Sequence, residues 1–350
     1  MIDSILQGDC IEILNTLPKK SVDMVFADPP YNMQLNGNLY RPNLTKVDAV
    51  DDDWDKFDSM QAYDEFTRRW LTACRRVLKD TGTLWVIGSY HNIYRVGAAL
   101  LDTNYWILNE IVWNRVNAMP NFNGTRFNHT HETLIWAQKK RGARYTFNYH
   151  AMKNANEDRQ MRSVWEIPIC SGNERIMFNG EKAHTTQKPE ALLYRVLVSS
   201  TKPGDVVLDP FFGTGTTGAV AKRLRRHWVG IERDAHYATI ARQRIDAVQA
   251  DTDDIPLYQP SNKPKPKRVA FIRLLEEGFL RVGQSLHLAN TEIYAQITAD
   301  GSLLYNGERG SIHQLSSKLL DAPCNGWTQW LYLDSTSGQW QTLDTLRQKV

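Results

Sequence analysis

The sequence predicts an α/β protein in two parts: a largely parallel sheet covered by helices over residues 1–254, and a small α+β domain over residues 269–350. Two observations predict this. Short apolar runs alternate with helical patterns up to Ile255, which is typical of a parallel sheet with crossover helices. The composition changes at Asp251, and residues 255–268 are rich in Pro and Lys without apolar periodicity, which indicates an extended linker.

The individual elements follow from apolar spacing. Strands are expected at 22–27, 83–87, 107–113, 133–137, 205–208 and 228–231, and helices at 60–79, 189–201, 216–226 and 235–250. Pro189 suits a first helical turn, because the amide hydrogen that it lacks would be unpaired there. Residues 271–280 form a short amphipathic helix pattern with a break at Gly278.

Composition limits the classes of function. With 350 residues, 42% of them hydrophobic, the chain can bury a large core. A net charge of +3 permits nucleic acid as a partner without requiring it. The four cysteines are far apart and show no C-x-x-C spacing, which argues against zinc or disulfide frameworks. No apolar run approaches the roughly 20 residues that span a bilayer, so we expect a soluble cytoplasmic protein.

Asp28-Pro29-Pro30-Tyr31 follows the predicted strand 22–27 at its C-terminal end, where open α/β sheets place active sites. The two prolines fix φ and remove two backbone donors, so carbonyls are held rigidly beside a carboxylate. Such a corner can accept hydrogen bonds from a flat amine, such as the exocyclic amine of a nucleobase, while Tyr31 stacks on its ring. The alternative interpretation is a surface turn, since Asp and Pro are common in turns.

A second motif joins the strand ending at Asp209 to a helix through a glycine-containing turn. Glycines let a backbone approach a ligand closely, and a helix N-terminus favours a carboxylate. Glu232 ends the next predicted strand, where an acid can bind ribose hydroxyls. There is no G-x-G-x-x-G and no Walker lysine, so the ligand has an adenosine-like ribose without a pyrophosphate, a description that S-adenosylmethionine meets. The alternative is an ordinary tight turn. The cofactor candidates in this motif are Asp209, Phe211, Gly213, Thr214, Gly215, Thr216 and Glu232.

Asp9 and Cys10 are weaker candidates near the N-terminus. Asp9 can cap a helix that starts near Ile11. It can also hydrogen-bond the adenine of a cofactor, and the two roles are compatible. We count both residues, together with Asp28, among the cofactor candidates.

The two main motifs together resemble those of the DNA amino-methyltransferases. Their order, catalytic loop first and glycine loop second, is similar to the β group, a circularly permuted version of the Rossmann-like methyltransferase fold. Asp at the first position of the catalytic loop is typical of adenine-N6 enzymes, whereas Ser is typical of cytosine-N4 enzymes. Further stretches resemble the cell-cycle-regulated GANTC adenine methyltransferases of α-proteobacteria, at residues 31–35, 46–55, 120–127, 131–136, 310–313 and 325–328.

The resemblance spans nearly the whole chain and implies a site-specific DNA adenine-N6 methyltransferase. Such an enzyme uses S-adenosylmethionine, acts on double-stranded DNA as a homodimer and flips the target base. By the resemblance, Asp28 and Pro29 accept hydrogen bonds from N6, and Lys188 lies near the cofactor's methionine end; a solvated lysine at a helix start is the alternative. Three other functions stay open: a cytosine-N4 enzyme, an RNA amino-methyltransferase or a non-catalytic DNA-binding regulator. A restriction-modification partner is also possible.

Three segments are expected to meet DNA. The first is a loop with an Asn-Gly turn signal, which could instead be a lid over the cofactor; the second is an insertion at about 114–185 with Asn and Arg side chains suited to base edges. The third is the C-terminal domain, where core packing explains the tryptophans at least as well as DNA does. The candidates are Leu35, Leu39, Arg41, Lys46 and Trp54 in the first, Arg115, Asn117, Asn121 and Arg126 in the second, and Ser311, His313, Asn325 and Trp327 in the third. We reject a metal site at His129, His131 and Glu132, because no further ligand is in register.

Overall fold

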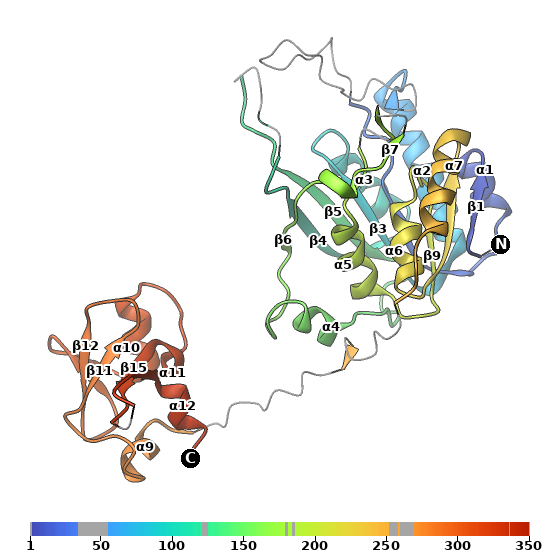
Figure 1. The fold of residues 1–350 in the computed structure, drawn as a ribbon. Helices are drawn as coiled ribbons and strands as arrows, with labels where there is room; N and C mark the ends of the chain where they lie inside the picture. Colours follow the sequence, from blue (N-terminus) through green and yellow to red (C-terminus); the bar gives the residue numbers. More distant parts are fainter. Residues whose placement is uncertain are drawn as a thin grey trace. The chain divides into compact units, whose positions relative to one another are not determined.

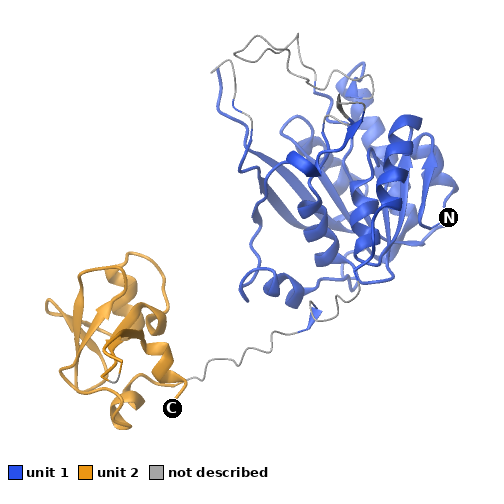
Figure 2. Ribbon diagram, viewed as in Figure 1, with its two compact units in different colours: residues 1–261 blue, residues 262–350 orange. Residues whose placement is uncertain are grey.

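The chain is described from a computed structural model, and two compact units divide it, residues 1–261 and 262–350 (Figure 1, Figure 2). The description covers residues 2–33, 55–118, 120, 125–178, 181–183, 186–251, 258–259, 269–335 and 337–349. Of the expected linker 255–268, only Tyr258 and Gln259 lie within the described residues.

Unit 1 is built on an eight-stranded sheet of order β1-β10-β9-β2-β3-β5-β4-β6. The first five strands are parallel to their neighbours, β5 is antiparallel to both β3 and β4, and β6 runs parallel to β4. All six strands expected from the sequence are present. In sheet order the bounds are Ser4–Gln7, His227–Glu232, Val206–Asp209, Val22–Ala27, Leu78–Gly88, His131–Gln138, Trp106–Asn114 and Val164–Glu166.

Helices cover both faces of this sheet (Figure 1). One face packs against α1 (Cys10–Thr16), α2 (Met60–Val77) and α3 (Ile93–Asp102). The other packs against α4 (Tyr149–Asn154), α5 (Glu190–Ser200), α6 (Thr216–Arg223) and α7 (Ala235–Asp246). The unit also holds a 3-10 turn, Gly172–Glu174, and the short hairpin of β7 (Met177–Phe178) and β8 (Glu181–Lys182).

The central strand β2 explains how both faces are filled. Met24 and Phe26 point into the layer of α4 to α7, whereas Val25 and Ala27 point into the layer of α1 to α3. All four side chains are at most 1% exposed. A strand buried on both faces is largely apolar, and this is why 24–27 reads as a continuous apolar run. Asp23, near the start of the strand, is partly exposed and pairs with Lys79.

The pairing of β2 with β9 determines where the two sequence motifs meet. The strands are parallel neighbours, with Met24 opposite Val207 and Val25 opposite Leu208. Their carboxyl ends therefore lie at the same edge of the sheet, and the loops that begin at Asp28 and Asp209 leave it side by side. Segments that are about 180 residues apart in the sequence are joined there.

Unit 2 is a six-stranded antiparallel sheet with short helices. The strand order is β14-β13-β12-β11-β15-β16, with bounds Glu308–Gly310, Leu303–Tyr305, Tyr294–Ile297, Ser285–Leu288, Trp330–Leu333 and Trp340–Thr342. The helices are α9 (Ile272–Glu276), α10 (Ile312–Leu319), α11 (Gly326–Gln329) and α12 (Leu343–Arg347). They enclose a separate apolar core that includes Leu286, Leu315 and Trp330. The helix expected over 271–280 is shorter than predicted, and Gly278, with φ of +77°, follows its end.

Within the described residues, no helix is long and apolar enough to cross a membrane. The four cysteines carry free thiols. In that same part of the chain, no group of three or more His, Cys, Asp or Glu side chains is arranged to hold a metal ion.

Candidate active site

A cavity of about 910 Å³ opens at the carboxyl ends of β2, β9 and β10. The glycine loop and the turn after β10 line one end, through residues such as Phe211, Gly213 and Glu232. The Asp28–Tyr31 corner lines the other end, together with Trp113, Arg115 and Glu132 from the neighbouring strands. The cavity is large enough for a nucleoside-sized ligand and a second flat group.

Glu232 and Asp209 place two carboxylates at the glycine-loop end. Glu232 accepts hydrogen bonds from the backbone N–H groups of Gly213, at 2.7 Å, and Asp234, at 2.8 Å, and its burial raises the pKa of the carboxyl. Asp209 accepts from the N–H of Phe211 at 2.9 Å and from the Thr217 hydroxyl at 2.6 Å. Burial raises the pKa of Asp209 to about 7.

Most of the remaining cofactor candidates line the cavity, whereas Gly215 packs against a helix behind it. Asp9 caps α1, since its Oδ1 accepts from the N–H groups of residues 11 and 12, and it lines the cavity together with Cys10. Thr214 and Thr216 line it as well. Gly215 faces the other way: its φ is +77°, and a Cβ there would lie 2.8 Å from the Cβ of Ala241 in α7. The structure therefore explains this glycine by turn conformation and helix packing.

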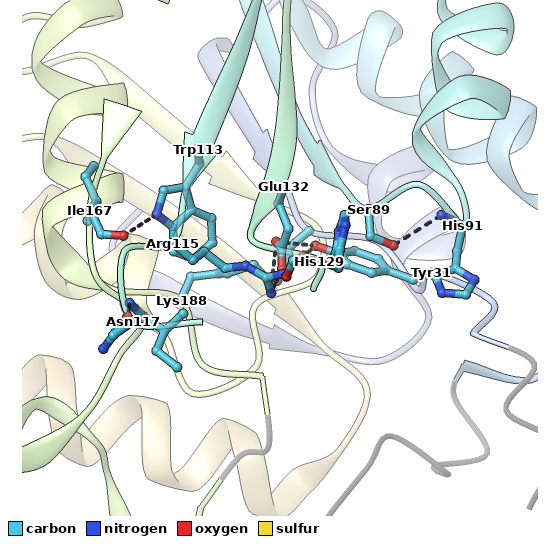
Figure 3. Close-up of polar contacts among 12 residues, drawn as sticks. Tyr31, Ser89, His91, Trp113, Arg115, Asn117, His129, Glu132, Ile167 and Lys188 are labelled. Atoms are coloured by element: carbon cyan, nitrogen blue, oxygen red, sulfur yellow. Dashed lines mark hydrogen bonds and ion pairs between the residues drawn. The ribbon is translucent and has the colours of Figure 1, made fainter. Parts of the chain in front are cut away.

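In the Asp28–Tyr31 corner, which is the predicted catalytic corner, Asp28 lies among charged and polar side chains. Its Oδ2 accepts a hydrogen bond from Lys188 Nζ at 2.8 Å, and its Oδ1 lies 3.0 Å from the Tyr31 hydroxyl. The same hydroxyl lies 3.1 Å from Glu132 Oε2, and Glu132 Oε1 accepts from Arg115 Nη1 at 3.1 Å. Figure 3 shows Tyr31, Arg115 and Glu132 converging at this end of the cavity.

Neighbouring groups shift two of the pKa values in this network. Burial raises the pKa of the Tyr31 hydroxyl well above its usual value, and the Asp28 and Glu132 carboxylates add to the effect. Burial alone would lower the pKa of Lys188, but the same two carboxylates outweigh it and raise that pKa. Both groups therefore keep their protons near neutral pH and act as hydrogen-bond donors.

The loop after β2 is held by a second carboxylate, Asp55. It accepts from three successive backbone N–H groups, those of Tyr31 at 2.5 Å, Asn32 at 2.9 Å and Met33 at 2.7 Å. The Tyr63 hydroxyl donates to the Pro30 carbonyl at 3.0 Å. Among the described residues no donor reaches the carbonyl of Pro29, which leaves it available beside Asp28.

Several DNA candidates of unit 1 have contacts inside the protein. Arg115 turns inward to Glu132 and to the His129 carbonyl, at 2.6 Å, and Asn117 Oδ1 accepts from the N–H of Ile169 at 2.8 Å. Arg126 lies at the cavity, where it donates to the Tyr90 hydroxyl at 2.9 Å. Leu35, Leu39, Arg41, Lys46, Trp54 and Asn121 lie outside the described residues.

The candidates of unit 2 stabilise its helices and core. Ser311 caps α10 in a capping box, and Asn325 caps α11. His313 Nδ1 accepts from the N–H of Gly326 at 3.0 Å. Trp327 is 5% exposed and packs edge-on against Phe271. These contacts give each residue a structural role, and a DNA contact by any of them stays a prediction.

Three residues of the site escaped the sequence analysis. Glu132 was considered only as a metal ligand, yet it pairs with Arg115 and contacts Tyr31. Asp55 received no role, although it holds the catalytic loop. His129 lines the cavity with a buried Nε2 that has no partner among the described residues, and burial lowers its pKa to about 4. A charged residue at the start of an apolar strand, as in His131-Glu132-Thr133, was the available signal for Glu132.

Comparison with known proteins agrees with this arrangement. Residues 22–243 match the family described as DNA methylase. A type II methyltransferase of Haemophilus influenzae, M.HinfI, is 48% identical over 347 residues, which cover 99% of this chain and 96% of that protein. The chain belongs to the DNA methylase family.

A further relative and two solved structures extend the comparison. M2.DpnII of Streptococcus pneumoniae, also a type II methyltransferase, is 43% identical over 244 residues, covering 69% of this chain and 89% of the relative. The crystal structure of the M1.HpyAVI–SAM complex matches 69% of this chain and 98% of its own, at 25% identity and a TM-score of 0.52. The cytosine-N4-specific PvuII methyltransferase, at 20% identity and a TM-score of 0.55 over 73% of this chain and 89% of its own, shares the fold.

The C-terminal part of this DNA methylase has a family match of its own. Residues 252–350 match the family described as Restriction Enzyme Adenine Methylase Associated. This match covers the whole of unit 2.

Proposed function

We propose that this DNA methylase transfers a methyl group from S-adenosylmethionine to N6 of adenine in double-stranded DNA. One observation carries the proposal: the Asp28–Pro29 acceptor corner and the glycine loop open onto the same cavity. The amine that is methylated and the methyl donor can therefore be held next to each other. Positioning of this kind supplies much of the rate in such reactions.

The residues at the glycine-loop end fit S-adenosylmethionine. Glu232, at the end of β10, offers carboxylate oxygens for ribose hydroxyls, and Asp9 and Phe211 line the same end of the cavity. The N-terminus of α6 and the nearby Lys188 suit the carboxylate of the methionine portion. When bound, S-adenosylmethionine supplies an electrophilic methyl group on a sulfonium. A solved neighbour of the same fold, M1.HpyAVI, is a complex with SAM.

The chain's own residues make the amine reactive. The N6 lone pair of adenine is delocalised into the ring, so the free amine is a poor nucleophile. Asp28 and the Pro29 carbonyl accept its two N–H groups and localise the pair on nitrogen. The Tyr31 ring lies beside them and offers a face on which the extruded base can stack. Asp55 keeps the loop rigid, so the acceptors are already in place before the base arrives.

Adenine rather than cytosine is favoured by two features. Asp28 stands where adenine-N6 enzymes typically carry Asp, and the family of the C-terminal part is named for adenine methylases. The resemblance to the GANTC enzymes extends the proposal to that recognition site, to base flipping and to a homodimer. It rests on residues 31–35, 46–55, 120–127, 131–136, 310–313 and 325–328. The type II relatives support a place in restriction-modification, while cell-cycle control of methylation rests on the resemblance alone.

The proposal is tested by the identity of the methylated base. The protein is incubated with labelled S-adenosylmethionine and duplex DNA, and the DNA is hydrolysed to nucleosides. We expect the label in N6-methyl-2′-deoxyadenosine. Label in N4-methyl-2′-deoxycytidine, or an absence of label in the DNA, would contradict the proposal.

A further inference from the structure

We infer that Glu132 is a positioning residue that frees Asp28 for the substrate by accepting the donors that occupy it. This inference rests on the proposed function, because it concerns how the adenine amine reaches Asp28. Glu132 lies near the start of β5, whereas Asp28 follows β2, so the two carboxylates reach the cavity from different strands. They share donors, since the Tyr31 hydroxyl contacts both carboxylates.

Both oxygens of Asp28 are already engaged. Lys188 Nζ lies 2.8 Å from Oδ2, and the Tyr31 hydroxyl lies 3.0 Å from Oδ1. An amine that is to donate to Asp28 must share or displace one of these donors. If a displaced donor found no new acceptor, a buried polar group would lose its hydrogen bond, which is unfavourable.

Glu132 offers that acceptor to the tyrosine. The Tyr31 hydroxyl has a single proton, yet it lies at hydrogen-bond distance from both carboxylates, 3.0 Å from Asp28 and 3.1 Å from Glu132. Rotation of one O–H bond moves the proton from one acceptor to the other without moving the ring. Asp28 Oδ1 is then free for an N–H of adenine, while the hydroxyl keeps a partner.

Glu132 offers the same alternative to the lysine. Lys188 Nζ lies 2.8 Å from Asp28 and 3.9 Å from Glu132. A movement of Nζ by about one ångström would therefore make the ion pair with Glu132 the shorter and stronger of the two. The side chains of both residues are about nine-tenths buried, with 10% and 11% of their surface exposed. The interaction is therefore little screened by solvent.

Arg115 holds Glu132 in place. It donates to Glu132 Oε1, on the side away from Tyr31, and is itself held by the carbonyl of His129. The network then holds two carboxylates and two cations, so it is electrically balanced around the catalytic corner. Replacing Glu132 by Gln would leave one positive charge in excess and remove the anionic acceptor.

The test uses the full chain with a Glu132→Gln variant and single-turnover methylation of duplex DNA. We expect the methyl-transfer rate to fall about 10- to 100-fold, with the dissociation constants for S-adenosylmethionine and DNA changed less than about threefold. Glu132→Asp, which keeps the charge but retracts it by one methylene, should recover part of the rate. Glu110→Gln, on the adjacent strand β4 and exposed, is the matched control and should behave as wild type.

A second comparison isolates the shared proton. In a Tyr31→Phe background the hydroxyl is absent, so Glu132→Gln should cost at least about threefold less than in wild type. Equal losses in both backgrounds would overturn the inference, as would a wild-type rate in Glu132→Gln. So would losses of binding and thermal stability that parallel the loss of rate, because they would indicate a merely structural role.

A variant that fails to fold and a failure of the proposed function give different results. If Glu132→Gln does not fold, Glu132→Asp carries the test: a lower rate at unchanged affinities supports the inference, and an unchanged rate overturns it. Failure of the proposed function is seen separately, in the wild-type protein, as an absence of label in adenine.

Discussion

At the scale of single residues, the proposed role of Asp28 is the most demanding, because its carboxylate must accept the substrate amine while it already contacts Lys188 and Tyr31. Its carboxylate is 20% exposed and lies between Lys188 and Tyr31. The neighbouring Pro29 carbonyl is the second acceptor for the amine. Neither residue forms part of the glycine loop, so the chemical step and cofactor binding can be separated by mutation.

Asp28→Ala removes the charged acceptor and should lower methylation by at least about a hundredfold. Binding of S-adenosylmethionine should persist, since the glycine loop and Glu232 are unchanged. Label incorporation measures the first quantity and equilibrium dialysis the second. Methyl incorporation at the wild-type rate in this variant would contradict the role of Asp28.

The raised pKa of Asp209 predicts that the free energy of unfolding depends on pH. Its pKa is about 7 in the folded protein, whereas an unfolded Asp has a pKa near ~3.9. The folded state therefore holds a proton between these values that the unfolded state has lost. Asp209 therefore makes its full contribution to the free energy of unfolding below about pH 4, and this contribution is lost as the pH rises through about 7.

Urea unfolding at pH 5 and pH 8 checks this dependence. Asp209→Asn should weaken the fall in the free energy of unfolding between these two pH values, while the exposed control Asp102→Asn should keep the wild-type slope. An identical slope in Asp209→Asn and wild type would show that the carboxyl does not titrate in this range.

At the scale of elements, the contact between β10 and the glycine loop is tight. Gly230, in β10, lies directly under the ring of Phe212, and a Cβ at this position would come within 2.4 Å of ring atoms. Phe212 in turn stacks on Trp228 with ring centroids 5.6 Å apart. The absence of a side chain at position 230 is what lets the loop pack onto the sheet.

Gly230→Ala should therefore destabilise unit 1 by about 1–3 kcal/mol, because the ring of Phe212 has to move. Gly97→Ala is the control: it lies in α3 and its Cβ would make an ordinary contact of 3.4 Å, so it should be neutral or slightly stabilising. Chemical unfolding of both variants measures the difference. Equal stabilities would contradict the tight packing.

Elements were more predictable than side-chain partners, and the reason is physical. The apolar run at 22–27 and the periodicity at 60–79 are local signals, and both appear as β2 and α2. The reversed direction of β5 has no local signal, because apolar runs do not encode direction. The contact of Glu132 with Tyr31 joins residues 101 positions apart, so it depends on strand order.

Capping residues also show that the partners of a side chain are harder to predict than helices and strands. Ser311 and Asn325 are predicted DNA contacts, and in the structure their side chains cap helices, so a DNA contact by either residue stays a prediction. Polar residues that precede helices serve in caps very commonly, and a sequence signal for capping exists in Ser311 with Gln314 three residues later. The family resemblance predicts DNA contacts at these positions, whereas the local sequence pattern predicts helix caps.

At the scale of the whole molecule, each unit has its own sheet and its own apolar core. Removal of residues 256–350 should therefore leave cofactor binding intact. We expect DNA affinity to fall by about a hundredfold or more, since a second binding module on the same chain raises the effective concentration of DNA at the site. Electrophoretic mobility shift of both proteins measures the loss, and unchanged affinity on truncation would refute a DNA-binding role for unit 2.

The most direct test of the central claim is methylation of defined duplexes by the intact protein. Labelled S-adenosylmethionine is supplied with duplexes that contain GANTC or a scrambled site, and the labelled base is identified. The account predicts label in N6-methyladenine, confined to the GANTC duplexes. Label in cytosine, or no label in either duplex, would contradict it.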